Sequence, residues 1–169
     1  MNTAILIARL FFGLGLVGHG AQKLFGWFGG HGLSGTSGLF ETLGFRPGRF
    51  FATAAALGET IGGVLTALGL FGPVGPALMV LVMIVAASIH TRNGFFTSDN
   101  GVELPILYAM GALLVAFTGP GAYSFDRLLG LLWMSKEEYA SIAIGIAAAA
   151  ALLTIAARHV LVDRTAHAT

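Results

Sequence analysis

Long apolar runs separated by short polar segments dominate the chain. A helix needs about 20 mostly apolar residues to cross a bilayer. The runs that approach or exceed this length cover residues 3–28, 50–71, 74–91, 104–118 and 139–161. Turn residues punctuate them, including Gly72-Pro73, Asn93-Gly94 and a GPG sequence at 119–121. The pattern predicts an all-α membrane protein: a four-helix transmembrane bundle plus an additional C-terminal transmembrane helix.

The segments between the runs suggest how the chain is organised. A Gly-rich loop joins the first two runs, and a very short turn joins the second and third, which predicts a tight antiparallel pair. The polar segment after the fourth run includes Trp133, which we expect at the level of the lipid head groups. We expect a four-helix core over residues 1–126, a polar or interfacial linker over 127–138, and the additional helix with a short tail over 139–169.

Composition supports the membrane assignment. Of the 169 residues, 56% are hydrophobic and only 10% are charged, and the mean hydropathy is +0.83. Soluble domains are about 25% charged, and a small one leaves much of its surface in water. The first run has no basic region before it and no A-x-A-like site after it, so we interpret it as a retained span rather than a signal peptide. We expect a multi-pass protein of the cell (plasma) membrane.

Charge and cysteine content exclude several kinds of function. The net charge is +1 and the nine basic residues are scattered, which argues against binding to nucleic acid. The absence of cysteine excludes disulfides, thiol redox chemistry, Fe–S clusters and Cys-zinc sites. Bis-histidine haem is disfavoured because His19 and His90 lie at different predicted depths and Lys23 is close to the first. We expect no metal site.

Loop charges predict the orientation. On the side of the N-terminus the loops carry Arg127 and Lys136, although Arg9 in the first run pulls the other way. The basic residues on the opposite side are Arg46, Arg49, Arg92, Arg158 and Arg164. Because cytoplasmic loops are enriched in Lys and Arg, we expect the N-terminus outside and the C-terminus in the cytoplasm.

Ionisable residues lie inside the apolar runs and converge on one half of the bundle. The stretch GHGAQKLFGW places His19 and Lys23 four residues apart, on one face of the first helix. Glu59 lies about nine residues into the second helix, or about 13 Å at 1.5 Å per residue, which matches the depth of His19. His90 lies near the end of the third helix, and Glu103 begins the fourth on the same side.

Two interpretations of this cluster remain open. An unpaired buried charge costs several kcal/mol, so we expect Lys23 to pair with Glu59. The cluster forms a ligand or proton-relay pocket, or the pair is only an interhelical clamp and Lys23 extends towards the interface. Gly18, Gly20 and Gly26 would let neighbouring helices approach the charged face. No catalytic residue is assigned, because Ser88 and His90 lie on different helix faces.

A second pair of charged residues lies on the opposite side of the membrane. Arg9 is inside the first helix, close to the N-terminus, and Asp126 follows the GPG sequence after the fourth run. We expect these two residues to form a structural clamp rather than to take part in chemistry.

Several of these segments together resemble the DoxX family of bacterial membrane proteins. They are RLFFGLGLVGHGAQKLFG, ETLGFRPG, GETIGGVLTALGLF, HTRNGFF with NGVEL, and GPGAYSFD, over residues 8–126. The resemblance implies a four-helix transmembrane bundle. It also implies that the positions belonging to the family pattern are Arg9, His19, Lys23, Glu59, His90 and Asp126. The family takes its name from a subunit of an archaeal thiosulfate:quinone oxidoreductase, and relatives are associated with membrane redox complexes, oxidative stress and quinone or catechol resistance.

Two functions follow as hypotheses. The first is a subunit or accessory of a membrane redox system that binds a quinone or similar small molecule in the polar pocket, with electrons supplied by a membrane or peripheral partner protein or a bound cofactor. The second is a non-enzymatic small-solute transporter or membrane scaffold that uses the same pocket. The bilayer is the expected environment in both cases, and a homo-oligomer is compatible with either.

Overall fold

A computed structural model describes the backbone of residues 1–166 and the side chains as far as Arg158. Of the tail predicted after residue 161, residues 167–169 and the side chain of Arg164 lie outside the described residues. Within this range the secondary structure is helical and contains no strands. The all-α prediction is therefore confirmed.

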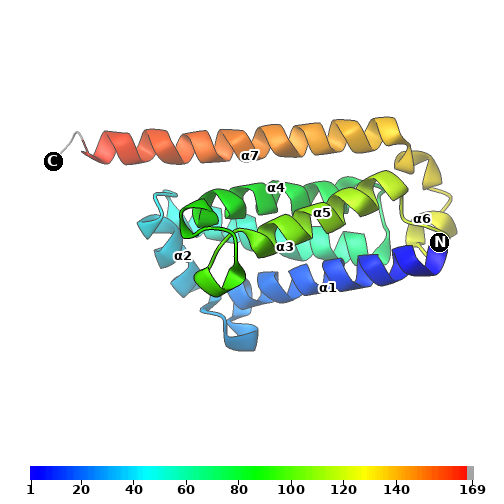
Figure 1. Ribbon diagram of the computed structural model, residues 1–169, viewed down its shortest axis with the longest axis horizontal. Coiled ribbons are helices and arrows are strands. Elements are labelled where there is room, and N and C mark those ends of the chain that lie inside the picture. Colours follow the sequence, from blue (N-terminus) through cyan, green and yellow to red (C-terminus); the bar gives the residue numbers. More distant parts are fainter. Residues whose placement is uncertain (167–169) are drawn as a thin grey trace.

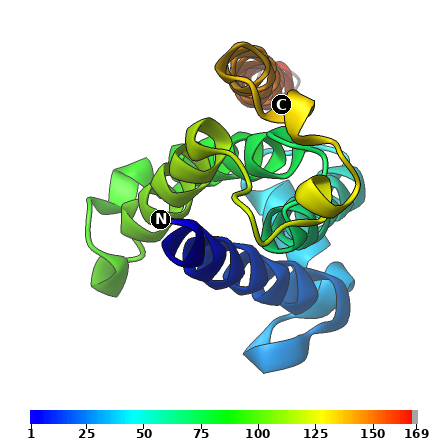
Figure 2. The same cartoon turned by 90° about the vertical axis from the view of Figure 1, so that its right-hand side faces the viewer.

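Four helices form the bundle, and each runs antiparallel to the next (Figure 1). Each helix contacts the next one in the bundle, and the first helix, α1, also contacts the last, α5. These contacts close the four helices into a ring (Figure 2). The helices are α1 (Asn2–Phe25), α3 (Gly48–Leu68), α4 (Val74–His90) and α5 (Glu103–Thr118). These bounds agree with the predicted runs to within a few residues, and the four-helix bundle is confirmed.

Length separates α5 from the other helices of the bundle. The segments long and apolar enough to cross a membrane are Asn2–Phe25, Gly48–Leu68, Val74–Asn93 and Glu137–Arg158. Helix α5 is apolar but has only 16 residues. It begins after a folded loop that contains two short 3-10 helices, η2 (Thr91–Asn93) and η3 (Thr97–Asp99).

Glycine brings α1 and α3 into backbone contact. A Cβ added at Gly13 would lie 2.6 Å from the carbonyl oxygen of Gly63, so no other residue fits without displacing a helix. Gly58 and Gly62, which have the G-x-x-x-G spacing, face α4 instead, where a Cβ on Gly62 would lie 3.0 Å from Cβ of Leu78. Close approach of this kind is how helices gain packing energy in lipid.

A helix replaces part of the predicted Gly-rich loop. Helix α2 (Gly32–Thr42) lies against α3 and buries Thr36 and Phe40. Phe40 joins Phe45 and Ala52 in a small apolar cluster, and this packing overrides the low helix propensity of the glycines. The loop prediction was therefore wrong for this segment.

The final long helix, α7 (Glu137–Ala166), lies outside the ring and packs against α4 (Figure 2). Its buried contacts are small, namely Ala140, Ala147 and Ala151. Much of the rest of its surface is apolar and exposed, as expected for a helix that faces lipid. The additional C-terminal helix is confirmed.

Two short helices connect α5 to α7 at the end of the bundle where α1 begins (Figure 1). They are α6 (Phe125–Leu128) and η4 (Leu132–Ser135). Leu128, Leu129 and Trp133 are more than half exposed in this segment. Its position at the membrane interface remains a prediction.

Candidate functional site

An ion pair between Lys23 of α1 and Glu59 of α3 lies at the centre of the candidate site. Nζ of Lys23 donates to both carboxylate oxygens of Glu59, at 2.8 and 2.7 Å. Glu59 is only 3% exposed, whereas the side chain of Lys23 is 26% exposed. An ammonium group has three N–H donors, so one remains for a further partner. The pair compensates the cost of burying each charge and still has a free donor.

Glycine again determines how the charged face of α1 meets α3. A Cβ on Gly20, one turn before Lys23, would lie 3.0 Å from the carbonyl oxygen of Ala56. Gly26 has a φ of 75° and ends α1 directly after the turn that carries Lys23. A Cβ added at Gly18 would have no neighbour within 4 Å, so Gly18 is not needed for another helix to come close.

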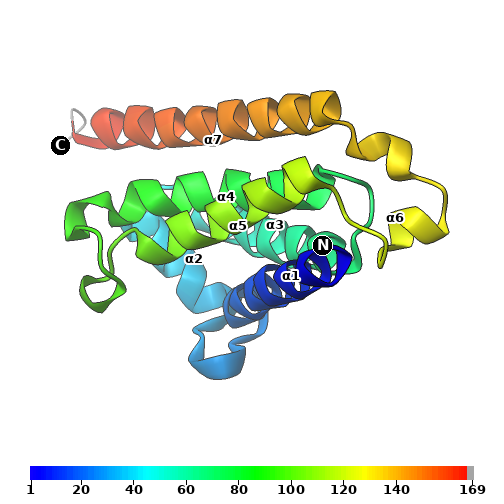
Figure 3. The same ribbon diagram turned by 45° about the vertical axis from the view of Figure 1, so that its right-hand side comes forward.

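The ion pair forms part of the wall of a cavity of about 620 Å³. Its lining includes residues of α2 and of the loop after α4. These two segments lie at the same end of the bundle (Figure 3). The apolar lining of the cavity consists of Leu39, Phe40, Leu43, Ala55, Val82, Val85, Ala86 and Ile89. Its polar lining consists of Lys23, Glu59, His90, Arg92, Asn93, Asn100 and Arg158. A largely apolar site with a few convergent polar groups is typical of small-molecule binding.

His90 lines the same cavity in a defined tautomeric arrangement. Its Nδ1 lies 2.7 Å from the carbonyl oxygen of Asn100. A carbonyl oxygen only accepts hydrogen bonds, so Nδ1 carries the proton and donates it. In the neutral ring Nε2 is then an acceptor. Two residues of the cavity lining can therefore bind a further partner, Lys23 through its third N–H and His90 through Nε2.

Two arginines at the cavity were not anticipated as site residues. Arg158 of α7 donates to the carbonyl oxygen of Leu43 at 2.6 Å, and its guanidinium lies 5.1 Å from the centroid of the Phe45 ring. Arg92 follows α4 and lines the cavity as an exposed side chain. Depth counting along the last helix, which has no other ionisable residue between Tyr139 and Arg158, would have placed Arg158 at this level.

His19 and Glu103 do not line this cavity. Nδ1 of His19 lies 3.1 Å from Oε1 of Gln22, and its ring packs edge-on against Tyr108 of α5 at 5.6 Å. Glu103 is exposed at the start of α5 and accepts the N–H of Thr97 at 2.8 Å. This hydrogen bond holds the pKa of Glu103 below its usual value. Glu103 orders the loop, whereas Lys23, Glu59 and His90 meet at the cavity.

Arg9 and Asp126 are both buried but form no direct ion pair. The guanidinium of Arg9 donates to the carbonyl oxygens of Thr66, Ala67, Pro120 and Tyr123. The carboxylate of Asp126 accepts the N–H groups of Phe71 and Gly72 at 2.8 and 2.6 Å. The two residues therefore act on backbone around the end of α3, and their function as a clamp remains a proposal.

Metal ligands do not cluster in the described part of the chain. No three His, Asp or Glu side chains there lie close enough together to hold an ion.

The fold and the cavity define a multi-pass α-helical membrane protein with a partly enclosed, largely apolar cavity that contains a few polar groups. The chain belongs to the DoxX family, whose model matches residues 4–92, just over half of the chain. This range contains Lys23, Glu59 and His90. Helices α5 and α7 lie beyond it.

Two curated relatives are similar to the chain. An uncharacterized membrane protein of Mycobacterium tuberculosis is 28% identical over 138 residues, which cover 75% of this chain and 81% of that protein. An uncharacterized protein of Haemophilus influenzae is 32% identical over 61 residues, which cover 36% of this chain and 40% of that protein. The chain thus matches less than half the length of the Haemophilus protein. No solved structure matches the chain.

Proposed function

We propose that the protein binds a quinone in the cavity beside Lys23 and serves as a subunit or accessory of a membrane redox system. One observation carries the proposal: an apolar-lined cavity holds a buried Lys23–Glu59 pair in its wall and His90 among its polar residues. A quinone has an apolar body and carbonyl oxygens that accept hydrogen bonds, so its chemistry is complementary to this lining. The family's association with quinones makes the same ligand class the first to test.

The polar residues have separate functions in this proposal. The free N–H of Lys23 donates to one quinone oxygen, and Glu59 keeps the ammonium charged and oriented. Reduction of a quinone to a quinol takes up two electrons and two protons. His90 exchanges protons at Nε2, because Nδ1 is held by Asn100. The electrons come from a partner protein or its cofactor, which makes this chain a binding and proton-handling subunit.

The proposed location of the protein is a bacterial plasma membrane, with the cavity towards the cytoplasm. The cavity lies near the end of the bundle where α1 ends, and loop charges assign that end to the cytoplasmic side of a bacterial plasma membrane. Protons for the quinone would therefore be exchanged with the cytoplasm.

Quinone retention tests the proposal directly. The protein is purified in mild detergent from quinone-containing membranes, its visible spectrum is recorded, and extracted lipids are quantified by mass spectrometry. We expect nearly one quinone per chain in the wild type. Lys23→Met removes a charged donor and should reduce retention about tenfold. Lys136→Met, a change of the other lysine in the chain, lies outside the cavity lining and should leave retention unchanged.

The contrary result is equally clear. Wild-type protein that co-purifies without quinone and fails to bind added quinone would reject the redox assignment. The non-enzymatic alternative, a small-solute transporter or scaffold, would then account for the cavity. Equal loss of quinone in the two lysine variants would show that retention depends on total charge rather than on this site.

A further inference from the structure

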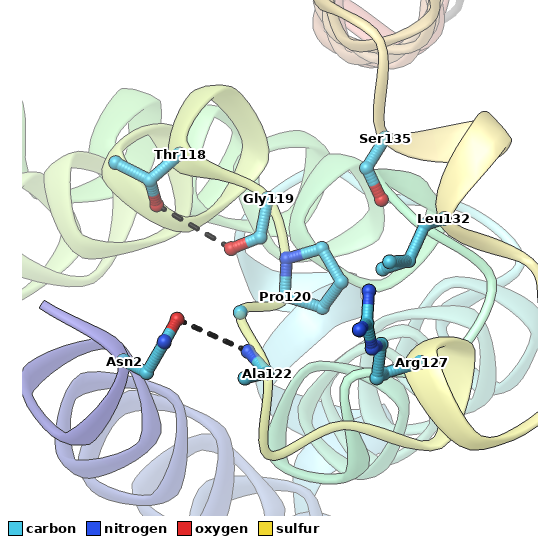
Figure 4. Close-up of a pocket in the computed structure, with 9 residues that line it drawn as sticks. Asn2, Thr118, Gly119, Pro120, Ala122, Arg127, Leu132 and Ser135 are labelled. Atoms are coloured by element: carbon cyan, nitrogen blue, oxygen red, sulfur yellow. Dashed lines mark hydrogen bonds between the residues drawn. The ribbon is translucent and has the colours of Figure 1, made fainter.

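A second cavity lies at the opposite end of the bundle from the Lys23–Glu59 pair. It has a volume of about 410 Å³ and lies where the N-terminus, the GPG turn and the connection to α7 meet (Figure 4). Its lining residues are Asn2, Thr118, Gly119, Pro120, Gly121, Ala122, Arg127, Leu132 and Ser135. The proposed redox function does not use any of these residues.

Some polar side chains of this cavity have unused hydrogen-bond donors. Oγ of Ser135 is buried and has no hydrogen-bond partner among the described residues. Burying a hydroxyl without a partner is costly, so this hydroxyl is available to a water or a ligand that enters the cavity. Figure 4 shows Ser135 and Arg127 directed into the same space beside Pro120.

The exposed Arg127 adds unused donors beside Ser135, whereas Asn2 lies on the other side of the Pro120–Ala122 segment (Figure 4). The Arg127 side chain forms no ion pair and no hydrogen bond within the described residues; only its backbone N–H is used, by Ser124. Oδ1 of Asn2 accepts the N–H of Ala122 at 3.2 Å, which leaves the Nδ2 hydrogens as donors. Arg127 is the one charged residue in the lining, and no carboxylate lines the cavity.

We propose that this cavity binds a phosphate group through Arg127 and Ser135. A guanidinium and a hydroxyl together provide donors without a competing negative charge, which suits an oxyanion. Arginine in particular matches the geometry of phosphate oxygens, because its fork presents parallel N–H groups.

The surroundings favour the head group of a membrane lipid as the source of that phosphate. Three large apolar side chains lie between Arg127 and Ser135 in the sequence and are exposed. They are Leu128, Leu129 and Trp133, with exposed fractions of 78%, 58% and 57%. Leucine and tryptophan at a polar site are typical of the bilayer interface, where acyl chains and head groups meet. Inorganic phosphate offers the same oxygen acceptors as the lipid head group but has no acyl chains to contact the apolar side chains.

The test compares lipid and free phosphate on the full chain. Detergent-purified protein is incubated with vesicle-derived phosphatidylglycerol or phosphatidylcholine, and bound lipid is counted by native mass spectrometry. Arg127→Gln and Ser135→Ala should each reduce retained phosphatidylglycerol about tenfold. Lys136→Gln is the matched control, because Lys136 directly follows Ser135 but does not line the cavity. In a second arm, thermal unfolding is measured in inorganic phosphate and in chloride at equal ionic strength.

Each outcome decides the proposal. Loss of lipid in both cavity variants, with the control unchanged, supports a lipid head-group site. A phosphate-dependent rise in melting temperature that Arg127→Gln abolishes, without lipid retention, supports a free-phosphate site. Unchanged lipid retention in both variants together with no effect of phosphate overturns the proposal. Arg127→Gln keeps the backbone hydrogen bond to Ser124, so folding should be preserved.

Discussion

Arg9 and Asp126 hold the same end of α3 without touching each other. Arg9 donates to carbonyl groups at Thr66 and Ala67, where the helix runs out of internal partners. Asp126 accepts the N–H groups of the turn that follows, at Phe71 and Gly72. Each buried charge thus forms its hydrogen bonds with backbone groups of opposite partial charge rather than with the other side chain.

This arrangement makes the shape of the Arg9 side chain as important as its charge. Arg9→Lys keeps the positive charge but has too few donors, in the wrong geometry, for four carbonyl groups. We expect it to lower the free energy of unfolding by about 2–3 kcal/mol, measured by thermal unfolding in detergent. Arg49→Lys, at an exposed side chain, should have no effect. Equal effects of the two substitutions would contradict the clamp.

Double substitution separates the two functions of the Lys23–Glu59 pair. Lys23→Met leaves a carboxylate buried without its partner and should cost about 3 kcal/mol of stability. Adding Glu59→Gln removes the uncompensated charge and should restore most of that loss. We expect the double variant to unfold near the wild-type temperature and still to retain about tenfold less quinone than the wild type. Recovery of quinone binding would mean that the pair is only a clamp.

The contact between Gly13 and Gly63 predicts strong sensitivity to a single methyl group. Gly13→Ala would force α1 away from α3, and overpacking of this kind costs about 1–3 kcal/mol. Gly18→Ala is the matched control on the same helix, because the space beside Gly18 is open. It should be neutral or stabilise the helix by up to about 1 kcal/mol. Comparing melting temperatures in detergent would reveal whether the two positions really differ.

Orientation can be tested by labelling, because the chain has no cysteine of its own. Asn100→Cys marks the loop after α4, and Ala122→Cys marks the opposite end of the bundle. In intact spheroplasts a membrane-impermeant maleimide should label the cysteine at 122 and reach the one at 100 only after lysis. The reverse pattern would place the N-terminus in the cytoplasm and the Lys23 cavity outside.

Depth along a helix could be read from the sequence, whereas rotation about its axis could not. Counting residues placed Lys23 and Glu59 in the same half of the bundle, and the structure joins them. The same count matched Glu59 in depth with His19, but the ring of His19 packs against Tyr108 of α5. Which neighbour faces a side chain depends on where the glycines allow two helices to touch. The first helix contains several glycines, and the sequence does not show which of them lie at a helix contact.

Tertiary packing explains the remaining differences. Helix α2 could not be predicted from the sequence because its glycines have low helix propensity. Its stability comes from burying Phe40 against α3. Arg158 contributed to the sequence analysis only as a loop charge. Its function at the cavity depends on α7 lying along α4, a contact made through alanines that carry no distinctive pattern.

The 16 residues of α5 have a consequence for the surrounding lipid. At 1.5 Å per residue the helix is about 24 Å long, about 6 Å short of the ~30 Å hydrocarbon layer. Leu107, Met110 and Leu114 face outward along it, so acyl chains meet this short surface directly. We expect the bilayer to thin beside α5, and the protein to be more stable in short-chain than in long-chain phospholipids. The stability of the bundle should therefore depend on the thickness of the membrane that surrounds it.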